Sequence, residues 1–357
     1  MKSFFIDFFP PPDYLSMPAV GLDISDLSIK YAELMRKDGD IAIRNFGEML
    51  MPAGMIEAGE IKDKEKLIEF LKPLKKEFKS KYIISCLPEE KAFLAKFEIP
   101  IMKDEDIKSA LEMQIEENVP LTSQEAIFDF DVIKGAPDSN HFDIFMIAFH
   151  KNTVNDYTEV FTGAGFEPLV FEMEVQAAAR TMVPKGEKGA LILVDFGRTR
   201  TSMAIVSDGQ VYFSSTLRVA GQEIDKMLMK NLGVDQFQAE KIKKEQGFTK
   251  DNEKIFNSIL PIVSVIKDEV GKAIDYWNSR VKNDQAKKIS KILLCGGDSN
   301  LFGFSEYISY ELKLPVELGN PWVNILSFDK HIPEIELKDA LKYATALGLA
   351  LREARYE

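Results

Sequence analysis

Two apolar runs, each ending in an aspartate and a tight turn, constrain the fold of this chain most. In the first, residues 20–22 lead to Asp23, and a second apolar run begins after a polar turn. In the second, residues 191–194 lead to Asp195-Phe196-Gly197, and residues 203–206 form the returning run. Such runs on either side of turn residues predict β-hairpins. Two hairpins that each carry an acid before the turn predict two related halves closing on one ligand.

Charge and length limit the classes of function. The 357 residues carry 45 basic and 57 acidic side chains, a formal net charge of −12. This balance argues against a general nucleic-acid-binding protein, which needs clustered lysines and arginines to neutralise phosphates. It is compatible with one nucleotide held by Mg²⁺ and backbone amides. The length predicts two or more subdomains rather than one small core.

Residues that bind transition metals are few. Cys86 and Cys295 each end a predicted buried strand, and we expect them to be small core residues in a protein of a reducing compartment. The three histidines are far apart, so a zinc site or a histidine-based triad has no support. No apolar window is long enough to span a bilayer.

The N-terminal segment, residues 1–18, is rich in phenylalanine and proline. It lacks the continuous apolar core and the cleavage site of a signal peptide. Two interpretations stay open: its aromatic side chains pack on the body of the protein, or they contact a partner or a membrane.

The rest of the chain alternates strands and helices. A module of strand, helix, strand and strand interrupts the first half at about 93–150, and a linker at 184–189 precedes the second half. Expected strands are 21–33, 41–50, 82–87, 93–99, 127–133, 142–149, 166–171, 211–217 and 289–295, and expected helices are 64–78, 104–118, 151–164, 174–182, 222–232, 235–246, 253–280, 302–312 and 337–352.

The two predicted hairpins have the chemistry of a phosphate and metal site. Asp23 and Asp195 are suited to holding Mg²⁺, mostly through water. The turns at 24–29 and 197–201 offer hydroxyls and backbone N–H groups to phosphate oxygens.

Two later motifs suit the nucleoside. Glu240 and Lys243, three apart on one helix, share a face that can clasp a ribose or a base. Gly296-Gly297 follows a buried strand and lets a flat base lie against bare backbone. Each motif alone has a structural alternative: a turn cap, a solvated ion pair or a tight turn. Their order along the chain favours the nucleotide site.

This order resembles the actin-like ATPase superfamily and, within it, the PilM family of type IV pilus assembly proteins. The superfamily motifs are a phosphate-1 hairpin (21–30), a connecting helix (174–179), a phosphate-2 hairpin (194–206), a helical motif (239–243), an adenosine motif (294–301) and a terminal helix (344–350). The likeness to the PilM family adds Ile99-Pro100-Ile101-Met102, Ala110-Leu111-Glu112, Asn118-Val119-Pro120-Leu121, residues 302–307 and Leu314-Pro315-Val316.

The resemblance implies an α/β fold of the actin-like, RNase H-like type, with two lobes and a small inserted α+β module. The implied subdomains are 1A at 19–90 and 151–185, 1C at 91–150, and a second lobe at 186–330 in which 2A carries the 2B helices at about 222–280. A C-terminal helix at 331–357 is expected to return to 1A.

The resemblance also implies the ligand and its residues. The ligands are ATP and Mg²⁺, with Asp23 and Asp195 as the metal residues, mainly through water. Glu174 matches a water-orienting glutamate of related ATPases, and its alternative role is a helix cap. The implied nucleotide-binding residues are Asp23, Ser25, Ser28, Lys30, Asp195, Gly197, Thr199, Thr201, Gly221, Glu240, Lys243, Gly296, Gly297 and Asp298.

The implied function is a cytoplasmic platform for pilus assembly, or for the related type II secretion. Such a protein grips the N-terminal cytoplasmic peptide of a PilN-like inner-membrane partner in a groove between 1A and 1C, and connects it to the motor. It sits at the inner face of the membrane through that partner and can assemble into a ring. Nucleic acid and a transmembrane segment are not expected, and ATP turnover is slow at most.

The first hairpin departs from the family pattern Asp-Ile-Gly-Ser-Ser-Ser. Ser25 places a Cβ where backbone should approach phosphate, and Asp26 adds a negative charge that costs about 1 kcal/mol if it lies close. Arg198 and Arg200 in the second turn either offset this charge or point to solvent. A Gly-Gly common in the family is Ala220-Gly221 here. We therefore expect residues 195–201 to hold a nucleotide more than residues 23–30 do.

Two other functions stay open. One is an ATP-hydrolysing polymer-forming protein like FtsA or MreB, although residues 352–357 do not resemble the amphipathic helix that usually ends FtsA. The other is a small-molecule kinase of the same superfamily, for which the sequence offers no catalytic base beside a sugar pocket.

Overall fold

The computed structural model describes residues 18–37, 40–134, 140–281, 287–326, 332–333 and 335–354. Nearly all of the phenylalanine-rich segment 1–18 lies outside the described residues, and so do both interpretations of its aromatic side chains. Within the described ranges, no helix is both long and apolar enough to cross a membrane.

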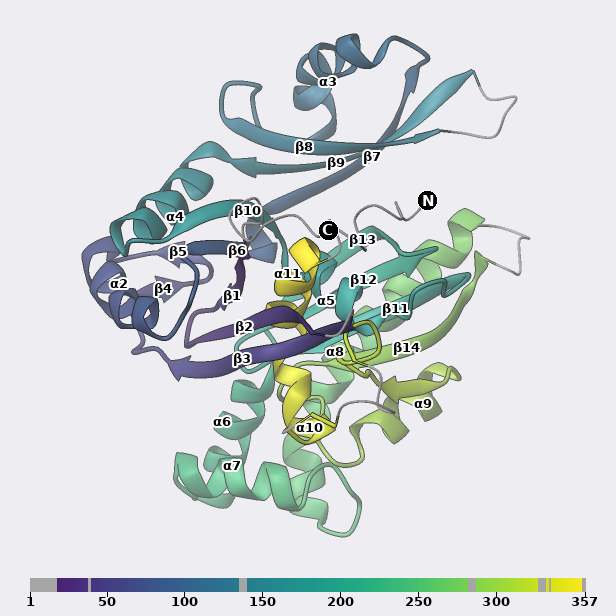
Figure 1. Ribbon diagram of the computed structural model, residues 1–357. Coiled ribbons are helices and arrows are strands. Elements are labelled where there is room, and N and C mark those ends of the chain that lie inside the picture. The colour runs from purple at the N-terminus through teal and green to yellow at the C-terminus, as the bar shows by residue number, and fades with distance from the viewer. Residues whose placement is uncertain are drawn as a thin grey trace.

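Two five-stranded sheets share one plan, as Figure 1 shows. In each, a central strand pairs antiparallel with its hairpin partner and parallel with a later strand. We call the first sheet with its helices lobe 1 and the second lobe 2. In order across the sheet, lobe 1 has β10 (Glu167–Met173), β6 (Tyr82–Leu87), β1 (Val20–Ile24), β2 (Ser28–Lys37) and β3 (Asp40–Leu50), and lobe 2 has β15 (Val316–Leu318), β14 (Ile289–Cys295), β11 (Ala190–Phe196), β12 (Thr201–Ser207) and β13 (Gln210–Leu217).

The central strand β11 is apolar along its length because both of its faces are covered. Leu191 and Leu193 belong to the core that lobe 1 and α5 share, whereas Ile192 and Val194 belong to the core under α6 and α8. A strand buried on both faces reads as a continuous apolar run rather than an alternating one. This is why the 191–194 run was such a strong signal in the sequence.

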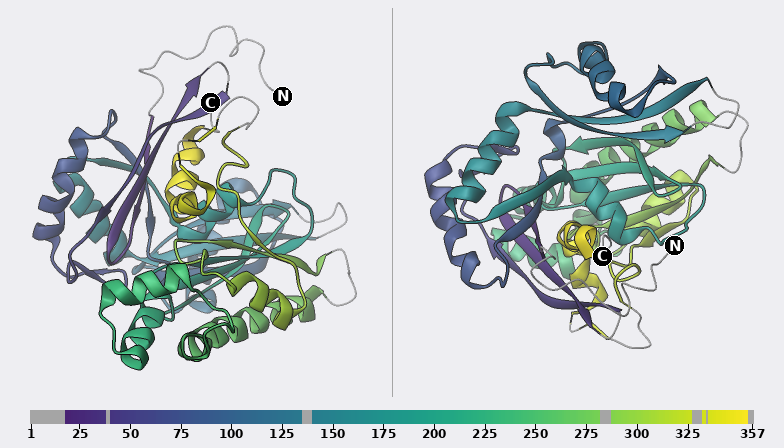
Figure 2. Two further views of the ribbon diagram at one scale, coloured as in Figure 1. Left: turned by 90° about the horizontal axis from the view of Figure 1, so that it is seen from below. Right: turned by 45° about the horizontal axis from the view of Figure 1, so that its top comes forward.

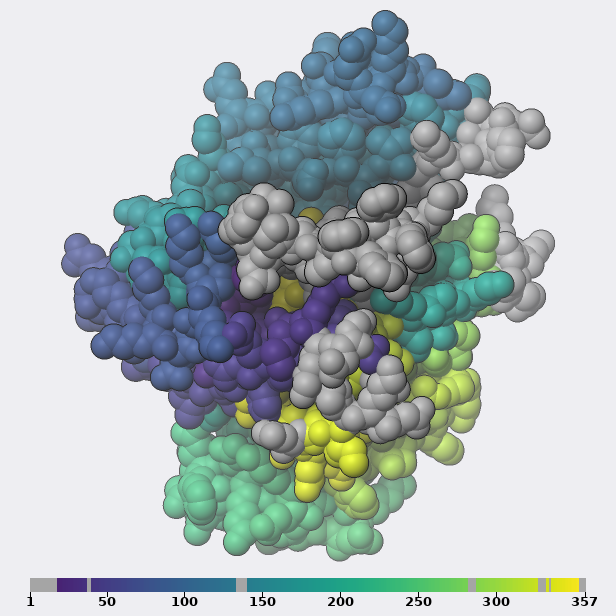
Figure 3. Space-filling view, in the orientation of Figure 1, coloured from purple at the N-terminus to yellow at the C-terminus, as the bar shows by residue number. Residues whose placement is uncertain are grey.

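A third sheet forms the module that the sequence predicted. It comprises β7 (Ala92–Pro100), β8 (Ala126–Lys134) and β9 (His141–His150) in the order β7-β9-β8, and its helix α3 (Asp104–Asn118) packs on one face. Ile107, Leu111 and Ile115 of α3 are buried against Ile144 and Met146 of β9. Figure 3 shows this module as the blue part at the top of the molecule.

Helices cover the two main sheets. Several predicted elements have the observed bounds, among them strands 82–87 and 289–295 and helices 104–118 and 174–182. The remaining elements are α2 (Lys64–Leu71), α4 (Lys151–Gly163), α5 (Glu174–Met182), α6 (Gly221–Leu232), α7 (Gln236–Glu245), α8 (Glu253–Val281), α9 (Phe304–Leu312), α10 (Leu337–Ala340) and α11 (Ala344–Ala354), the short strands β4 (Ile56–Glu57) and β5 (Glu60–Ile61), and the 3-10 turns η1 (Lys72–Lys76), η2 (Glu89–Lys91) and η4 (Leu341–Tyr343).

Two expected helices differ from the prediction. The helix expected over 64–78 becomes 3-10 after Leu71, where Pro73 follows. The helix expected over 337–352 is broken by η4. At this break the Leu341 carbonyl accepts a hydrogen bond of 3.1 Å from the Gly296 amide. The broken turn therefore ties the C-terminal helix to the glycine turn of lobe 2.

Helix α11 lies between β1 and α5, visible as the yellow helix beside the purple strands in Figure 2. Two glycines allow this packing. A Cβ on Gly21 would lie 2.1 Å from the Ala346 carbonyl oxygen, and one on Gly348 would lie 1.8 Å from the Ala177 carbonyl oxygen. Both distances are far below van der Waals contact, so only hydrogen fits where the backbones cross.

We expect Gly348→Ala to lower the free energy of unfolding by about 3 kcal/mol, because the added methyl group overpacks the crossing of α5 and α11. The matched control is Gly271→Ala in α8, whose Cβ would meet only Leu312 at 3.5 Å. It should be neutral or stabilise by about 0.5–1 kcal/mol, since alanine favours a helix more than glycine does. Urea unfolding measures both, and equal effects would contradict the packing argument.

Candidate functional site

The turns of the two hairpins have the same geometry. Asp23 pairs with Lys30 across the first hairpin, and Asp195 pairs with Ser202 across the second. Each turn closes with one equivalent hydrogen bond, from the Ser25 amide to the Ser28 carbonyl at 2.9 Å and from the Gly197 amide to the Arg200 carbonyl at 3.1 Å. The repeat inferred from the sequence is confirmed by these registers.

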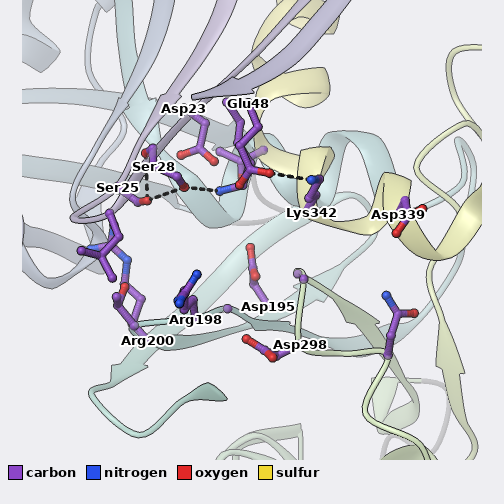
Figure 4. Close-up of a pocket in the computed structure, with 18 of the residues that line it drawn as sticks. Asp23, Ser25, Ser28, Glu48, Asp195, Arg198, Arg200, Asp298, Asp339 and Lys342 are labelled. Carbon is purple, nitrogen blue, oxygen red and sulfur yellow. Dashed lines mark hydrogen bonds and ion pairs between the residues drawn. The ribbon is translucent and has the colours of Figure 1, made fainter. Parts of the chain in front are cut away.

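The two turns face one another across a cavity of about 380 Å³. Figure 4 shows Asp23 of lobe 1 and Asp195 of lobe 2 directed into it from opposite sides. We call this cavity the cleft. The predicted site residues that line it are Asp23, Ser25, Ser28, Lys30, Glu174, Asp195, Gly197, Thr199, Glu240, Lys243, Gly296, Gly297 and Asp298.

Two residues predicted to contact the nucleotide lie outside this lining. Thr201 is buried, and its hydroxyl donates to the Val219 carbonyl at 2.7 Å. Gly221 begins α6, and a Cβ there would lie 2.1 Å from an Asp298 carboxylate oxygen. Gly221 therefore lets α6 approach the glycine turn closely, and Thr201 fixes the base of the second hairpin.

Lys243 is buried and bonded within lobe 2. Its ammonium lies 2.9 Å from Asp225 and 2.8 Å from Asp298, and donates to the Gly221 carbonyl at 3.3 Å. Burial by itself would lower the pKa of Lys243, but the two carboxylates raise it above its ordinary value. Glu240, which was predicted to hold the nucleoside together with Lys243, is half-buried and pairs with Lys244 at 2.9 Å. Lys243 thus fixes α6, α7 and the glycine turn together.

The glycine pair has two different roles. Gly296 has φ of +92°, and a Cβ on it would lie 2.3 Å from an Asp195 carboxylate oxygen and 2.5 Å from the Phe196 carbonyl. It is required for the turn to pass behind the second hairpin. Gly297 faces open space, because the nearest atom to its Cβ position is the Lys342 Cβ at 3.7 Å. Gly297 is therefore the glycine that leaves room for a flat group.

The charges of the cleft suit a polyphosphate with a divalent cation. Burial, followed by the negative charge of Asp23, raises the pKa of Asp195 to about 6. A cation between the two carboxylates would relieve this repulsion. Lys30 and Arg198 also line the cleft; Lys30 donates to the Ser28 hydroxyl at 2.9 Å, and neither cation forms a salt bridge among the described residues. Oxygen ligands and nearby unpaired cations are the set that Mg²⁺ and phosphate require.

The departures in the first turn have local partners. The Ser25 hydroxyl donates to the Ser28 carbonyl at 3.0 Å, so it is held within the turn. The Asp26 carboxylate accepts the backbone N–H groups of Ala58 and Gly59 at 3.0 and 3.1 Å. Asp26 thus turns toward the β4–β5 loop and is not among the residues that line the cleft. The expected repulsion from its charge is correspondingly reduced.

Arg200 joins the lobes, a role that the sequence did not reveal. Its guanidinium binds Glu90 at 2.7 Å and Glu174 at 3.0 Å, and all three side chains are largely buried. Burial by itself would lower the pKa of Arg200, whereas Glu174 and Glu90 raise it further above its ordinary value. Burial raises the pKa of Glu174 despite the arginine. We call these three residues the clasp.

Glu174 is not a helix cap. It is the first residue of α5, whose N-cap is Met173 and has no side-chain cap bond. Its carboxylate lines the cleft and lies close to Asp23, because the ligand atoms of Asp23, Cys86 and Glu174 all lie within 4.8 Å of one another. The water-orienting role stays a prediction, with Arg200 as the partner that holds the carboxylate.

Sequence reasoning also missed one wall of the cleft. Lys342 on η4 pairs with Glu48 on β3 at 2.5 Å, and both line the cavity. Their positions are 294 apart in the sequence, and no local motif signals such a pair. Arg198 and Arg200, for which the sequence left two roles open, line the cleft. The other missed lining residues are Leu50, Ser202, Asp225, Lys244, Asn300, Lys338, Asp339 and Thr345.

A second cavity, of about 680 Å³, lies between the module and the two lobes. We call it the groove. Its apolar side comes from the inner face of the module sheet, opposite α3, and its other sides come from lobe 1 and the β12–β13 turn of lobe 2. The lining includes Leu94, Ile127, Asp129, Asp131, Phe145, Ile147 and Phe149 of the module, Phe171, Glu172, Gln176, Ala179 and Arg180 of lobe 1, and Gly209, Gln210 and Val211 of lobe 2.

Glu89, next to the clasp, is a buried carboxylate. Neither of its oxygens makes a hydrogen bond within the described part of the chain, although Ser214 and the Val175 amide lie beside it. Burial raises the pKa of Glu89 from its ordinary 4.5 to about 7. The folded protein therefore disfavours the ionised form.

This shift predicts the pH dependence of stability. Above pH 7 Glu89 is ionised in both states, and its burial lowers the free energy of unfolding. This loss of stability shrinks as the pH falls from 7 toward 4.5 and is absent below 4.5. Glu89→Gln should therefore raise the free energy of unfolding by up to about 3 kcal/mol at pH 8 and by less at pH 6. Urea titrations at pH 6, 7 and 8 measure this. The control is Glu65→Gln, at an exposed position of α2. A gain in Glu89→Gln that is equal at all three pH values would refute the raised pKa of Glu89.

The chain matches one family of known proteins. The family model for the type IV pilus assembly protein PilM matches residues 21–354. No protein among the curated sequences matches. A solved PilM-PilN type IV pilus biogenesis complex has a TM-score of 0.79 at 21% identity, covering 94% of this chain and 98% of that chain.

Two more distant structures share the fold. The ethanolamine utilization protein EutJ from Carboxydothermus hydrogenoformans has a TM-score of 0.56 at 17% identity, covering 96% of this chain and 90% of that one. MreB5 of Spiroplasma citri bound to AMPPNP has a TM-score of 0.54 at 14% identity, covering 94% and 96%. The fold is therefore actin-like, with two lobes. With its family model matched from residue 21 to 354, the chain belongs to the PilM family of type IV pilus assembly proteins.

Proposed function

We propose that this chain is an ATP-binding platform protein of pilus assembly. It binds the N-terminal cytoplasmic peptide of a PilN-like inner-membrane protein and links that partner to the motor. The observation that carries the proposal is the groove between the module and lobe 1, in a chain whose family match includes a structure solved with PilN. The protein sits at the cytoplasmic face of the membrane through this partner, as a monomer or in a ring.

The groove suits an extended apolar peptide. Leu94, Phe145, Ile147 and Phe149 form an apolar surface on the module. The opposing wall carries Glu172, which is almost fully buried and binds Arg180 at 2.6 Å and Arg352 at 2.9 Å. An apolar cavity with a few fixed polar groups is the usual form of a binding site, in which the polar groups set orientation.

The cleft suits Mg-ATP in the manner of AMPPNP-bound MreB5. Asp23 and Asp195 would hold the cation through water, and the turns with Lys30 and Arg198 would contact the phosphates. The adenosine would lie against Gly297, over the turn that Lys243 supports. Bound Mg²⁺ would neutralise phosphate charge. The second hairpin keeps Gly197 where the first has Ser25, so residues 195–201 would do more of the holding.

Hydrolysis is slow at most. Glu174 faces the cleft, but Arg200 binds its Oε1 at 3.0 Å, which leaves one oxygen in a direction that the ion pair fixes. A group that orients water needs a free acceptor oxygen directed at the nucleophile. The chain then uses nucleotide as a structural or regulatory ligand. The polymer-forming alternative shares the fold, and no feature of the cleft favours it over the platform role.

Asp195→Asn tests the cleft. The substitution keeps the shape beside Gly296 but removes the charge that would hold the hydrated cation, so Mg-ATP affinity should fall by about 100-fold or more. Isothermal titration calorimetry measures it. The control is Asp208→Asn, at the exposed far end of the same hairpin, which should bind like the wild type. Unchanged affinity in Asp195→Asn would mean that nucleotide does not bind there.

Ile127→Asp tests the groove. Ile127 is 40% exposed on the module face that lines the groove, so an aspartate there disrupts peptide contacts without opening the core. Affinity for a synthetic N-terminal peptide of the PilN-like protein should fall by about tenfold or more, because apolar contact is replaced by a charge that must be desolvated. Met113→Asp, on α3 at 84% exposure, is the control and should bind normally. If calorimetry detects no binding of the peptide to the wild type, the platform function is wrong.

A further inference from the structure

Two connections join lobe 1 to the module: β9 (His141–His150) passes directly into α4 (Lys151–Gly163), and a short link precedes β7. Strand β6 ends at Leu87, η2 occupies Glu89–Lys91, and β7 of the module begins at Ala92. Both carboxylates of this link approach lobe 2. Glu90 binds Arg200 at 2.7 Å, and Glu89 lies beside Ser214 of β13. A change in the position of lobe 2 therefore acts directly on one of the two segments that carry the module.

Arg200 stands where cleft and link meet. It belongs to the turn of the second hairpin, lines the cleft, and its two terminal nitrogens bind Glu90 and Glu174 of lobe 1. Figure 4 shows it at the edge of the cleft, beside Arg198. A polyphosphate in the cleft would compete with Glu90 for this guanidinium, since arginine binds phosphate and carboxylate in the same bidentate geometry.

Lobe 2 touches the module a second time, beside the groove. Tyr212 of β13 packs edge-on against Phe145 of β9 with ring centroids 4.7 Å apart, and Lys96 of β7 lies over both rings at 5.2 and 5.4 Å. Phe145 also lines the groove, together with residues 209–211 of lobe 2. The groove is therefore enclosed by three bodies. A rotation of lobe 2 on lobe 1 changes its width.

From these contacts we infer that the cleft and the groove are coupled through the clasp: nucleotide in the cleft redirects Arg200, shifts the Glu89–Lys91 link, and so changes the affinity of the groove for the partner peptide. The inference rests on the proposed function and adds its regulation. Coupling between two binding sites is reciprocal, so the peptide must change nucleotide affinity by the same factor.

Glu90→Gln tests the coupling. Glu90 lines neither the cleft nor the groove, and glutamine keeps its shape while weakening the bond to Arg200. Calorimetry measures peptide affinity with and without saturating Mg-AMPPNP. In the wild type the affinity should change by about fivefold or more in either direction. In Glu90→Gln the change should drop below about twofold while both ligands still bind. The control is Glu69→Gln, at an exposed position of α2, and it should behave as the wild type.

Hydrogen exchange gives a second readout without the peptide. Mg-AMPPNP should alter the exchange of amides 89–95 in the wild type and not in Glu90→Gln. Peptide affinity that ignores the nucleotide, or a full effect in Glu90→Gln, overturns the coupling but leaves the platform function intact. Absence of peptide binding under both conditions overturns the platform function and the coupling together.

Discussion

The structure depends on backbone crossings that only glycine allows. Gly21 and Gly348 bring β1, α11 and α5 so close that the Cβ of any other residue would overlap a carbonyl oxygen. Because α11 (Ala344–Ala354) begins directly after the broken turn, whose Leu341 carbonyl accepts a hydrogen bond from Gly296, one helix links the central strand of lobe 1 to the glycine turn of lobe 2. The packing of α11 therefore contributes to the distance between the two aspartates.

The two lobes are copies whose side chains have diverged. The matching turn hydrogen bonds make Ser25 equivalent in position to Gly197, Asp26 to Arg198 and Ser28 to Arg200. The buried cysteines also occupy equivalent positions. The Cys86 sulfur lies 3.5 Å from the Asp23 carboxylate, and Cys295 is the neighbour of Asp195 in the register of β14 and β11. Lobe 2 contributes the positive charges of the turns, while in lobe 1 the Asp26 charge is directed to backbone amides of the β4–β5 loop. The divergence places the positive charges of the two turns on the lobe 2 side of the cleft.

The sequence predicted features that local patterns encode. Apolar runs, acids before turns and glycine pairs identified the hairpins, the module and most of the cleft lining. Contacts between distant residues were out of reach: Glu90 and Arg200 are 110 positions apart, and Glu48 and Lys342 are 294 apart. Thr201 and Gly221 show another limit. A hydroxyl or a glycine near a site has the same sequence signal whether it faces a ligand or the protein interior.

Stability alone does not explain the clasp, because a buried ion pair loses hydration that its attraction only partly restores, and apolar replacements are often as stable. Here one guanidinium serves two carboxylates in a largely buried position, an arrangement that leaves an excess negative charge. What such a cluster provides is specificity of geometry, since the three groups tolerate few relative positions. It lies where the cleft, α5 and the module link converge. Any anion that enters the cleft must alter the balance of charge around Arg200, and the module link is among the elements that respond.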